Sequence, residues 1–358
     1  MTLLITGGAG FIGTRVLDLW DHDERVVIFD NLHPQVHGPD ATPIDYPDSV
    51  TFFRGDVTRP DDWDLLLQAH RPRVILHLAA ETGTGQSLTQ ATRHSEVNVT
   101  GTAMMMDALS RASVFPEQIV LTSSRAVYGE GLWRNVASGT RFYGYPRVAE
   151  DLEAGRWTPG GSGGDASEPL PHDARVVEPR PSNVYAATKL AQENLLSAWC
   201  TSFHVGLTIF RLQNVYGAGQ ALNNPYTGVL TAFARSLLEG RPVQIFEGGG
   251  IVRDFVHVRD VAGALIAGLQ LREGGQATGP IDIGSGEPMS LFAAAEVMAR
   301  IAGGSVTTTT DYRLGDVRAA SADNSAAFSA LGYSPRVDFE SGARELLDWA
   351  SKEIQGHG

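Results

Sequence analysis

The chain has 358 residues, 42% of them hydrophobic, and a formal net charge of −13. The length suffices for one large α/β domain and a smaller one, and the composition is that of an ordinary folded protein. The acidic excess argues against a nucleic-acid partner, because phosphate backbones require a basic surface. The single cysteine, Cys200, excludes an internal disulfide framework and a cysteine-clustered zinc site, and we predict no metal site.

The sequence also carries no membrane signal. No apolar run approaches the roughly 20 residues needed to cross a bilayer. The first predicted strand begins at Thr2, which leaves no room for a signal peptide. We therefore expect a cytoplasmic protein with no membrane partner.

The first thirteen residues carry the clearest pattern. Residues 2–6 are predicted to form a strand and residues from 11 to about 20 a helix, with Gly7, Gly10 and Gly13 three apart. The first glycine allows a tight turn, the second lets backbone N–H groups approach a pyrophosphate, and the third lets the helix pack closely on the strand. With a strand before it and a helix after it, the triplet indicates a dinucleotide-binding site rather than an ordinary turn.

Two acidic residues at the ends of the next strands bear on the cofactor. Asp30 ends the strand 25–29, and a carboxylate there can accept hydrogen bonds from both hydroxyls of the adenosine ribose and repel a 2′-phosphate. We therefore predict NAD rather than NADP. Asp56 follows the strand 50–54, where we expect its carboxylate to meet the adenine amino group; the alternative is a loop cap.

Predicted strands and helices alternate up to about residue 211. The further strands are 74–78, 119–122 and 206–211, and the helices are 60–70, 95–111 and 182–201. This alternation predicts an α/β fold, a Rossmann-type doubly wound parallel sheet with right-handed crossovers, whose ligands bind beyond the carboxyl ends of the strands.

The regular alternation is lost after residue 211. Helices near 227–239 and 261–270 and short strands at 243–246 and 281–283 indicate a smaller, mixed α/β carboxyl-terminal domain. We predict an NAD-binding domain of residues 1–205, with 131–181 as an insertion and 240–268 returning to it. The substrate-binding domain is then residues 206–239 and 269–358.

The irregular segment 131–181 is too long for an ordinary loop, so we expect it to be functional or disordered. Its glycine run, 160–164, is predicted to be mobile. The segment joins Ser124 to the helix that carries Tyr185, which favours a partial lid; a surface elaboration or a dimer contact is an equal alternative.

Tyr185 and Lys189 lie one helical turn apart. A phenol titrates near pH 10, so a base active near pH 7 needs a pKa lower by ~3, or ~4 kcal/mol. A cation ~4 Å away at an effective dielectric of ~20 supplies about that much, so we expect Lys189 to lower the pKa of Tyr185. Ser124, at the end of a strand, can hydrogen-bond the same substrate oxygen. A solvated pair is the common reading of this spacing, but the preceding dinucleotide motif favours a catalytic set of Ser124, Tyr185 and Lys189.

At these motifs the chain resembles the extended short-chain dehydrogenase/reductases that act on nucleotide sugars. The matching segments are 7–13, 30–32, 55–57, 77–80, 98–102, 123–129, 185–189, 211–217 and 253–260. The resemblance implies NAD held by the first domain, a nucleoside-diphospho-sugar held by the second, and a homodimer formed through the helices near 95–111 and 183–200.

The site residues follow from this resemblance. The predicted cofactor contacts are Gly7, Gly10, Phe11, Ile12, Asp30, Asn31, Asp56, Val57, Leu78, Ala79, Ala80, Asn98, Tyr185 and Lys189. The predicted substrate contacts are Thr82, Ser124, Asn214, Asn224, Gln244, Phe246, Arg253 and Arg313. By position, Asn98 holds the loop beside the central strands and Asn214 faces the diphosphate. Arg253 and Arg313 neutralise that diphosphate, and Gln244 and Phe246 lie where such proteins hold the base.

The reaction is predicted from residues that are missing. Nucleotide-sugar 4,6-dehydratases carry an Asp-Glu pair before the Val-Tyr-Gly motif, and the related decarboxylases carry a glutamate there, but this chain has Arg125 and Ala126. It therefore looks like the UDP-glucose 4-epimerase branch, while residues 81–87 and 224–228 look like relatives acting on 6-deoxyhexoses, such as dTDP-L-rhamnose 4-epimerases. We predict an NAD-dependent 4-epimerase, an isomerase, acting on a UDP- or dTDP-hexose or 6-deoxyhexose. The alternatives are a 4-ketoreductase, dehydrogenase or dehydratase on the same fold, or a non-enzymatic dinucleotide sensor.

Overall fold

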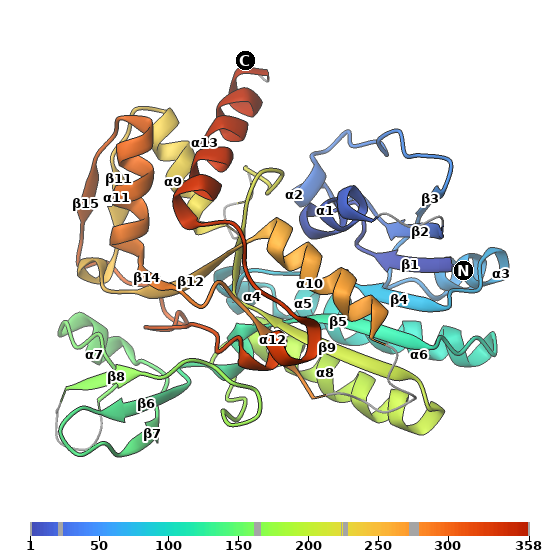
Figure 1. The fold of residues 1–358 in the computed structure, drawn as a ribbon, viewed down its shortest axis with the longest axis horizontal. Coiled ribbons are helices and arrows are strands. Elements are labelled where there is room, and N and C mark those ends of the chain that lie inside the picture. The colour runs from blue at the N-terminus through green and yellow to red at the C-terminus, as the bar shows by residue number, and fades with distance from the viewer. Residues whose placement is uncertain are drawn as a thin grey trace.

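A seven-stranded sheet forms the centre of the molecule in the computed structural model, which describes residues 2–20, 24–160, 166–222, 224, 228–271 and 279–356. Its order is β13-β9-β5-β4-β1-β2-β3, and every neighbouring pair is parallel (Figure 1). The strands are β1 (Thr2–Thr6), β2 (Arg25–Asp30), β3 (Val50–Arg54), β4 (Val74–His77), β5 (Gln118–Ser124), β9 (Gly206–Leu212) and β13 (Ile281–Ile283). The chain runs outward from β1 in one direction and then from β4 in the other, so the strand order reverses between β1 and β4, where such sheets bind ligands.

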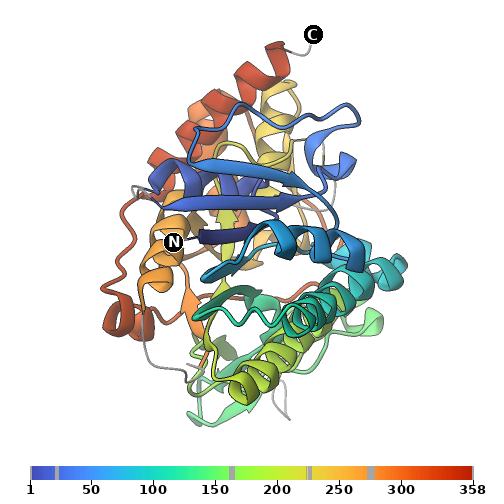
Figure 2. The ribbon, with the colours of Figure 1, turned by 90° about the vertical axis from the view of Figure 1, so that its right-hand side faces the viewer.

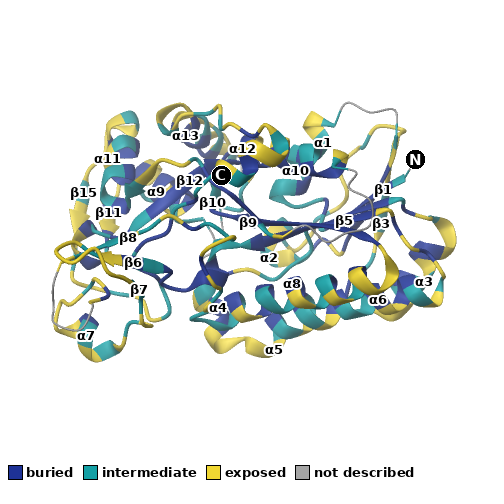
Figure 3. Cartoon of the chain, turned by 60° about the horizontal axis from the view of Figure 1, so that its bottom comes forward, coloured by how far each residue is buried: buried dark blue, intermediate teal, exposed yellow. Residues whose placement is uncertain are grey.

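Helices cover both faces of this sheet, which is why its central strands are almost continuous runs of Val, Ile and Leu. On one face lie α1 (Phe11–Leu19) and α10 (Val258–Gln270), with Val16 and Leu265 packed on Leu3 and Ile5. On the other face lie α3 (Pro60–Ala69), α6 (Gly101–Arg111) and α8 (Val184–Phe203). Figure 2 shows α6 and α8 together on that second side. Figure 3 shows buried strands β5 and β9 between the two helical layers.

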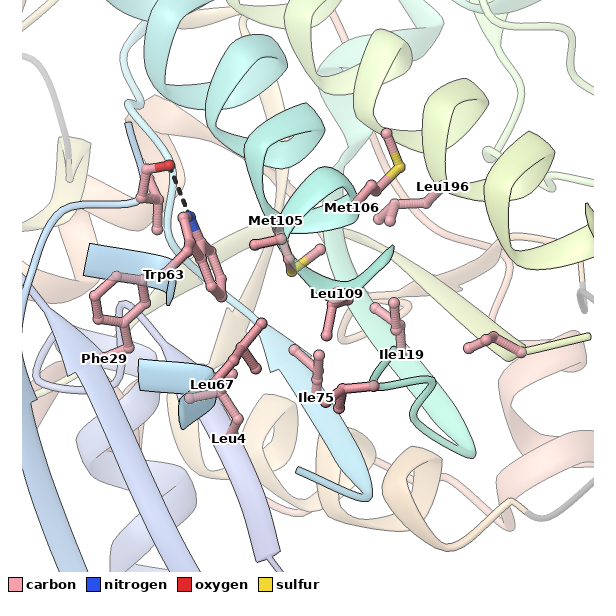
Figure 4. Packing of buried hydrophobic residues seen from close by; sticks show 14 of the residues in the cluster. Leu4, Phe29, Trp63, Leu67, Ile75, Met105, Met106, Leu109, Ile119 and Leu196 are labelled. Carbon is pink, nitrogen blue, oxygen red and sulfur yellow. Dashed lines mark hydrogen bonds between the residues drawn. The ribbon is translucent and has the colours of Figure 1, made fainter. Parts of the chain in front are cut away.

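Trp63 of α3 anchors the loop that follows β3. Its indole is fully buried against the edge of Phe29, with ring centroids 4.7 Å apart, and its Nε1 donates to the Val57 carbonyl at 2.9 Å (Figure 4). Pro60 begins the helix, where its missing N–H costs nothing. The core of the sheet thereby fixes the position of Asp56 and Val57.

The predicted helix 95–111 is present with a change of pitch. Residues Ser95–Thr100 form a π-helical segment, η1, that continues directly into α6. Such single π turns inside helices are frequent at functional sites. The other predicted strands and helices are present; α10 differs most, since it begins at Val258 rather than at residue 261.

The carboxyl-terminal part has its own core. It holds a three-stranded sheet, β10-β12-β14, a two-stranded sheet, β11-β15, and three longer helices. These are β10 (Asn214–Tyr216), β12 (Val252–His257), β14 (Pro288–Ser290), β11 (Val243–Ile245), β15 (Val306–Thr308), α9 (Val229–Leu238), α11 (Leu291–Ala302) and α13 (Phe339–Gly356). Leu230, Phe233, Met298 and Leu346 meet between these elements.

Three segments lie differently from the predicted domain division. β9 and β13, which fall within the segments assigned to the substrate domain, pair in the seven-stranded sheet because both are fully buried parallel strands. β11, expected to return to the first domain, instead pairs with β15 in the carboxyl-terminal part. The division into two domains stays a proposal. In it, β9 and β13 now belong to the first domain and β11 to the second.

The segment 131–181 forms a small three-stranded antiparallel sheet, β7-β6-β8. Its elements are β6 (Leu132–Asn135), β7 (Arg141–Tyr143), α7 (Ala149–Glu153) and β8 (Ser167–Pro169). Figure 1 shows this sheet in green beside the carboxyl-terminal sheets. The mobility expected for 160–164 concerns residues that, from 161 on, lie outside the described part of the chain.

The remaining described elements are short. They are α2 (Pro34–His37), α4 (Thr84–Thr89), α5 (Ala91–His94), α12 (Ser325–Leu331) and the 3₁₀ turns η2 (Arg125–Tyr128) and η3 (Glu247–Gly249).

Candidate active site

A cavity of about 460 Å³ opens at the carboxyl ends of β1, β2, β4 and β5 and reaches the carboxyl-terminal part. It brings together most of the residues predicted to form the site. Those that line it are Gly7, Gly10, Phe11, Ile12, Asp30, Asn31, Asp56, Val57, Leu78, Ala79, Ala80, Thr82, Ser124, Tyr185, Asn214 and Asn224.

The glycine turn at one end of the cavity has the backbone that its sequence predicts. Gly7 has φ +67°, and a Cβ there would lie 2.8 Å from the backbone nitrogen of Ala79. A Cβ on Gly13 would collide with the carbonyl oxygen of Gly8, so only glycine lets α1 pack this closely. Gly10 precedes α1 and no side chain caps that helix, which leaves backbone N–H groups free for an anion.

Asp30 is held rigidly at the end of β2. Its Oδ2 accepts from the Ala9 N–H at 3.1 Å and its Oδ1 from the Leu32 N–H at 2.8 Å. A carboxylate has about four lone-pair sites, so acceptor capacity remains for a ribose. His37 lies 3.8 Å from Oδ1, and burial lowers its pKa despite the charge of Asp30.

Asp56 forms the loop cap that the sequence left open as the alternative. Its Oδ1 accepts from the backbone and side chain of Thr58, at 2.8 and 2.7 Å, and its Oδ2 accepts from Asn31 at 2.9 Å. Burial raises the pKa of Asp56, but these hydrogen bonds outweigh it and the pKa is lowered. Asp56 and Asn31 still line the cavity, so their contact with adenine stays a prediction.

Asn98 lies behind the cavity wall rather than on it. The π segment η1 points it, fully buried, at the loop after β4, where it accepts from the Glu81 N–H at 2.8 Å and donates to the Glu81 carbonyl at 3.0 Å. It also donates to Thr188 of α8 at 2.9 Å. Asn98 thus joins the loop to α8, as its expected loop-holding role requires, while Glu81 itself lines the cavity.

Ser124 and Tyr185 meet at the cavity wall. Ser124 is the last residue of β5, and Tyr185 lies in the first turn of α8, which Asn183 caps by accepting from the Ala186 N–H at 2.9 Å. Burial raises the pKa of Tyr185, while the hydrogen bond with Ser124 and the charge of Arg125 act in the lowering direction. The two hydroxyl groups can therefore share a proton with one substrate oxygen.

Lys189 is buried within α8 and hydrogen-bonded to a residue of the same helix. Its Nζ donates to Gln192 Oε1 at 2.7 Å, and the side chain is buried. Burial, opposed by the charge of Glu193, lowers the pKa of Lys189 to about 7. Burial raises the pKa of Tyr185 in this structure, so the expected lowering by Lys189 and its place in the catalytic set stay predictions.

Arg125 is a residue of the site that was not predicted. In the sequence it indicated only that the acidic residue of the dehydratases is missing. It lines the cavity beside Ser124, and its Nε donates to Asn214 Oδ1 at 2.8 Å. Burial is the largest cause that lowers the pKa of Arg125, to about 9, so the guanidinium still carries its charge at neutral pH. Its position directly after Ser124, the last residue of β5, is the sequence feature that could have indicated a place in the cavity wall.

The remaining predicted substrate residues lie apart from this cavity in the described structure. Arg253 is buried and donates to Asp316 Oδ1 at 2.5 Å and to the Val317 carbonyl at 2.8 Å. Gln244 and Arg313 are exposed, and the Arg313 guanidinium lies 5.3 Å from the centroid of the Phe246 ring. The base and diphosphate contacts assigned to these four residues stay predictions.

Polar side chains that the sequence analysis did not select also line the cavity. Arg93 forms an ion pair with Glu81 at 2.6 Å. Gln35 of α2 donates to Gln86 Oε1 at 2.9 Å and to Asn224 Oδ1 at 3.3 Å, and so joins α2 to the carboxyl-terminal part. The partners are 51 and 189 residues apart in the sequence, so no local sequence pattern predicts these contacts.

The segment 131–181 contributes no lining residue among those described, 131–160 and 166–181. The predicted lid is therefore not found in these residues. They dock instead on the carboxyl-terminal part, where Arg147 pairs with Glu247 at 2.6 Å. Among all the residues that the structure describes, from 2 to 356, no helix is long and apolar enough to cross a bilayer. The same residues contain no group of three or more His, Cys, Asp or Glu side chains placed to hold a metal ion.

These residues fit a dinucleotide. A glycine cradle that a Cβ would fill, an uncapped helix start and a fixed carboxylate at the end of β2 are the parts that hold a pyrophosphate and an adenosine ribose.

Comparison with known proteins agrees with this geometry. The chain matches the model of the family described as "NAD dependent epimerase/dehydratase family" over residues 3–148 and 160–284. It is 44% identical over 355 residues to a dTDP-L-rhamnose 4-epimerase of Burkholderia thailandensis, covering 98% of this chain and 95% of that one.

Two solved structures show the same fold over the whole chain. MoeE5 in complex with UDP-glucuronic acid and NAD is 28% identical, with a TM-score of 0.75 and coverage of 99% of this chain and 100% of that one. The UDP-glucose 4-epimerase of Thermus thermophilus, in complex with NAD, is 27% identical, with a TM-score of 0.74 and coverage of 98% and 99%. The chain belongs to the NAD-dependent epimerase/dehydratase family, the extended short-chain dehydrogenase/reductases that act on nucleotide sugars.

Proposed function

We propose that this chain is a nucleotide-sugar 4-epimerase whose substrate is a dTDP-linked 6-deoxyhexose, with dTDP-L-rhamnose as the first candidate. The observation that carries the reaction is the pair of hydroxyl groups, Ser124 and Tyr185, on the wall of a cavity that fits a dinucleotide. The enzyme is an NAD-dependent isomerase. NAD held by the glycine turn and Asp30 would supply a reversible hydride acceptor for C4 of the sugar.

The chain's own residues bind, orient and move a proton. Tyr185 accepts the proton of the C4 hydroxyl and later gives it back, and Ser124 holds the same oxygen by a hydrogen bond. Asp30 and the glycine turn hold the cofactor at the other end of the cavity. We also propose the other cofactor and substrate contacts predicted from the sequence. Asn98 contributes indirectly, because it holds the backbone of Glu81 at the cavity.

Epimerisation is favoured over dehydration by the two residues after Ser124. Elimination of water across C5 and C6 needs an acid and a base beside the sugar, and Arg125 and Ala126 supply neither carboxylate. The 44% identity to the rhamnose enzyme, against 28% and 27% for the UDP-sugar proteins, favours a dTDP-6-deoxyhexose.

We also propose a homodimer formed through α6 and α8. Phe115, in the loop after α6, and Phe203, the last residue of α8, are 46% and 42% exposed and stack with ring centroids 4.9 Å apart. An exposed aromatic pair of this kind is common at interfaces. The cytoplasmic location expected from the sequence stays a prediction.

The test is a panel of dTDP- and UDP-linked sugars incubated with purified protein and catalytic NAD, with products identified by NMR. We expect dTDP-L-rhamnose to give its C4 epimer with no net formation of reduced cofactor, and Tyr185→Phe to abolish conversion. Reduced cofactor formed in proportion to product would instead support a dehydrogenase. Unchanged sugars throughout the panel would reject the proposal and favour a dinucleotide sensor. Equal conversion by Tyr185→Phe would reject Tyr185 as the base.

A further inference from the structure

A histidine of α2 lies beside the carboxylate of Asp30 in the cavity wall. His37 Nε2 is 3.8 Å from Asp30 Oδ1, and both residues line the cavity. Their side chains are 18% and 7% exposed, so both are largely withdrawn from bulk solvent. The imidazole makes no hydrogen bond to another residue that the structure describes. A polar ring placed in this way favours a partner in the ligand.

Both members of this pair are held in place by the protein. Asp30 accepts from the Leu32 N–H at 2.8 Å and from the Ala9 N–H at 3.1 Å. Leu32, between Asp30 and α2, has a φ of +53°, which is unusual for a bulky side chain. The helix itself is anchored through Gln35, whose side-chain amide is bound to two residues of other elements. The separation between imidazole and carboxylate is therefore set before a ligand binds, which lowers the cost of binding.

This separation matches one hydroxyl group that bridges the two side chains. At 3.8 Å, Nε2 and Oδ1 are too far apart for a direct hydrogen bond, whose N···O distance is about 2.7–3.2 Å. One oxygen at ~2.8 Å from each atom fits between them. A hydroxyl group is suited to that place, because it donates its hydrogen to the carboxylate and accepts another from the ring.

The charge state of His37 agrees with this arrangement. Burial lowers the pKa of His37 below the usual 6.5, although the charge of Asp30 acts in the opposite direction. The ring is therefore neutral at pH 7, with one N–H donor and one acceptor nitrogen, and the hydrogen can stand on Nε2. A neutral donor beside a carboxylate serves a neutral ligand group such as a hydroxyl.

The other titratable groups near this carboxylate are engaged elsewhere. His33 lines the cavity, but its Nδ1 caps the start of α2. Arg93 forms an ion pair with Glu81 at 2.6 Å. Tyr46 does not line the cavity. In the described part of the wall, His37 is therefore the group available to act with this carboxylate.

We propose that His37 and Asp30 together bind the 2′-hydroxyl of the adenosine ribose of NAD, and that the pair selects NAD over NADP. The proposal rests on one part of the proposed function, that Asp30 holds this ribose; an acidic residue at this place in such folds binds the 2′-hydroxyl. NADP carries a phosphate on that oxygen. Two atoms 3.8 Å apart leave room for one oxygen but not for a phosphate group. His37 thus excludes NADP by space, whereas Asp30 excludes it by charge.

The test compares NAD with its 2′-deoxyadenosine and 3′-deoxyadenosine analogues. Dissociation constants are measured by displacement of bound NADH, followed by its fluorescence, so no turnover is needed. In the wild type we expect the 2′-deoxy analogue to bind at least tenfold more weakly than NAD, because a hydrogen bond to a charged group is lost. In His37→Ala this ratio should fall by about three- to tenfold, because NAD loses the contact with the ring and the analogue never made it.

Three comparisons isolate the contribution of the ring. The ratio for the 3′-deoxy analogue should be the same in the wild type and in His37→Ala. His37→Gln keeps an N–H donor of similar reach and should recover part of the ratio for the 2′-deoxy analogue. His70→Ala replaces a histidine that ends α3 and does not line the cavity, and it should leave every constant unchanged.

The preference for NAD over NADP is measured in the same assay. Removal of the ring weakens the binding of NAD and gives space to the 2′-phosphate. We therefore expect the preference to fall in His37→Ala by about three- to tenfold or more.

The outcomes that would overturn the proposal are distinct. Equal weakening of NAD and its 2′-deoxy analogue by His37→Ala would leave the ring a structural role only. A change confined to the 3′-deoxy ratio, or an unchanged preference over NADP, would also contradict the proposal. If His37→Ala does not fold, His37→Phe, which keeps a ring without the donor nitrogen, replaces it in the comparison of the analogues.

A failure of the proposed function can be told apart from a failure of this proposal. If the 2′-deoxy analogue binds the wild type as tightly as NAD, Asp30 does not hold this hydroxyl and the ribose assignment fails as well. If the ratio is large but the same in His37→Ala, only the role of His37 is rejected. Because the assay contains no sugar nucleotide, an absence of epimerase activity leaves both results interpretable.

Discussion

Arg147 connects the segment 131–181 to the rest of the protein through buried charge. Its Nη1 donates to Glu247 Oε2 at 2.6 Å, its Nη2 to the Asp316 carbonyl at 2.7 Å, and its Nε lies 3.1 Å from Glu130 Oε1. The side chains of Arg147, Glu247 and Glu130 are 4%, 0% and 2% exposed. Replacing Arg147 with methionine keeps an unbranched side chain but removes the guanidinium and its charge.

The structure gives the size of the expected loss. Removing one partner of a buried ion pair costs about 3–5 kcal/mol, because the other charge is left uncompensated. Glu247 retains Arg318 at 3.1 Å, so we expect the lower value, about 3 kcal/mol. Unfolding entropy of about 2.1 cal/mol/K per residue gives roughly 0.75 kcal/mol/K for 358 residues, so Tm should fall by about 4 °C.

Thermal unfolding followed by circular dichroism measures this change, with Arg156→Met as the matched control. Arg156 lies in the same segment, is 62% exposed and pairs with Asp151 at 2.6 Å. Exposed pairs contribute about 0–1 kcal/mol, so its Tm should fall by at most about 1 °C. Equal Tm values for the two variants would show that the buried contacts of Arg147 do not stabilise the protein.

Two further predictions concern the cofactor and the pH dependence of stability. Asp30→Asn loses the charge and one acceptor oxygen, so NAD should bind at least tenfold more weakly and the preference for NAD over NADP should shrink. Calorimetric titration with each cofactor measures the two dissociation constants. An unchanged ratio of these constants would contradict the prediction. Burial lowers the pKa of His172 to about 3, below the ordinary 6.5, so the unfolded chain takes up this proton first and stability is lost as pH falls from about 6.5 towards 3. His172→Phe keeps an aromatic ring against Tyr128. Between pH 6.5 and about 3, its free energy of unfolding, measured with urea, should fall by up to about 1.4 kcal/mol less per pH unit than that of the wild type. Parallel plots of this free energy against pH for the two proteins would contradict the role of His172.

The fold could be predicted because its causes are local. Runs of Val, Ile and Leu report buried parallel strands, and the spacing of Gly7, Gly10 and Gly13 reports the turn between β1 and α1. Ser124 and Tyr185 could be brought together because one ends a strand and the other opens the helix beside it.

The parts that could not be predicted depend on contacts between distant residues. Whether Arg253 is free for a diphosphate depends on Asp316, 63 positions away, and the direction of Lys189 depends on how deeply α8 is buried. The role of the segment 131–181 depends on Arg147 reaching Glu247, 100 positions further along. Such pairings follow from the packed structure and leave no periodicity in the sequence.

The hydrogen bonds of Gln35 have a consequence for turnover. They tie α2 both to Gln86 and to Asn224, so the two parts of the protein share one wall of the cavity. We therefore expect a dinucleotide held in this cavity to exchange more slowly while these contacts persist. A catalyst that restores its oxidant in every cycle gains from slow cofactor exchange, and an amide bridge of this kind provides it without a covalent bond.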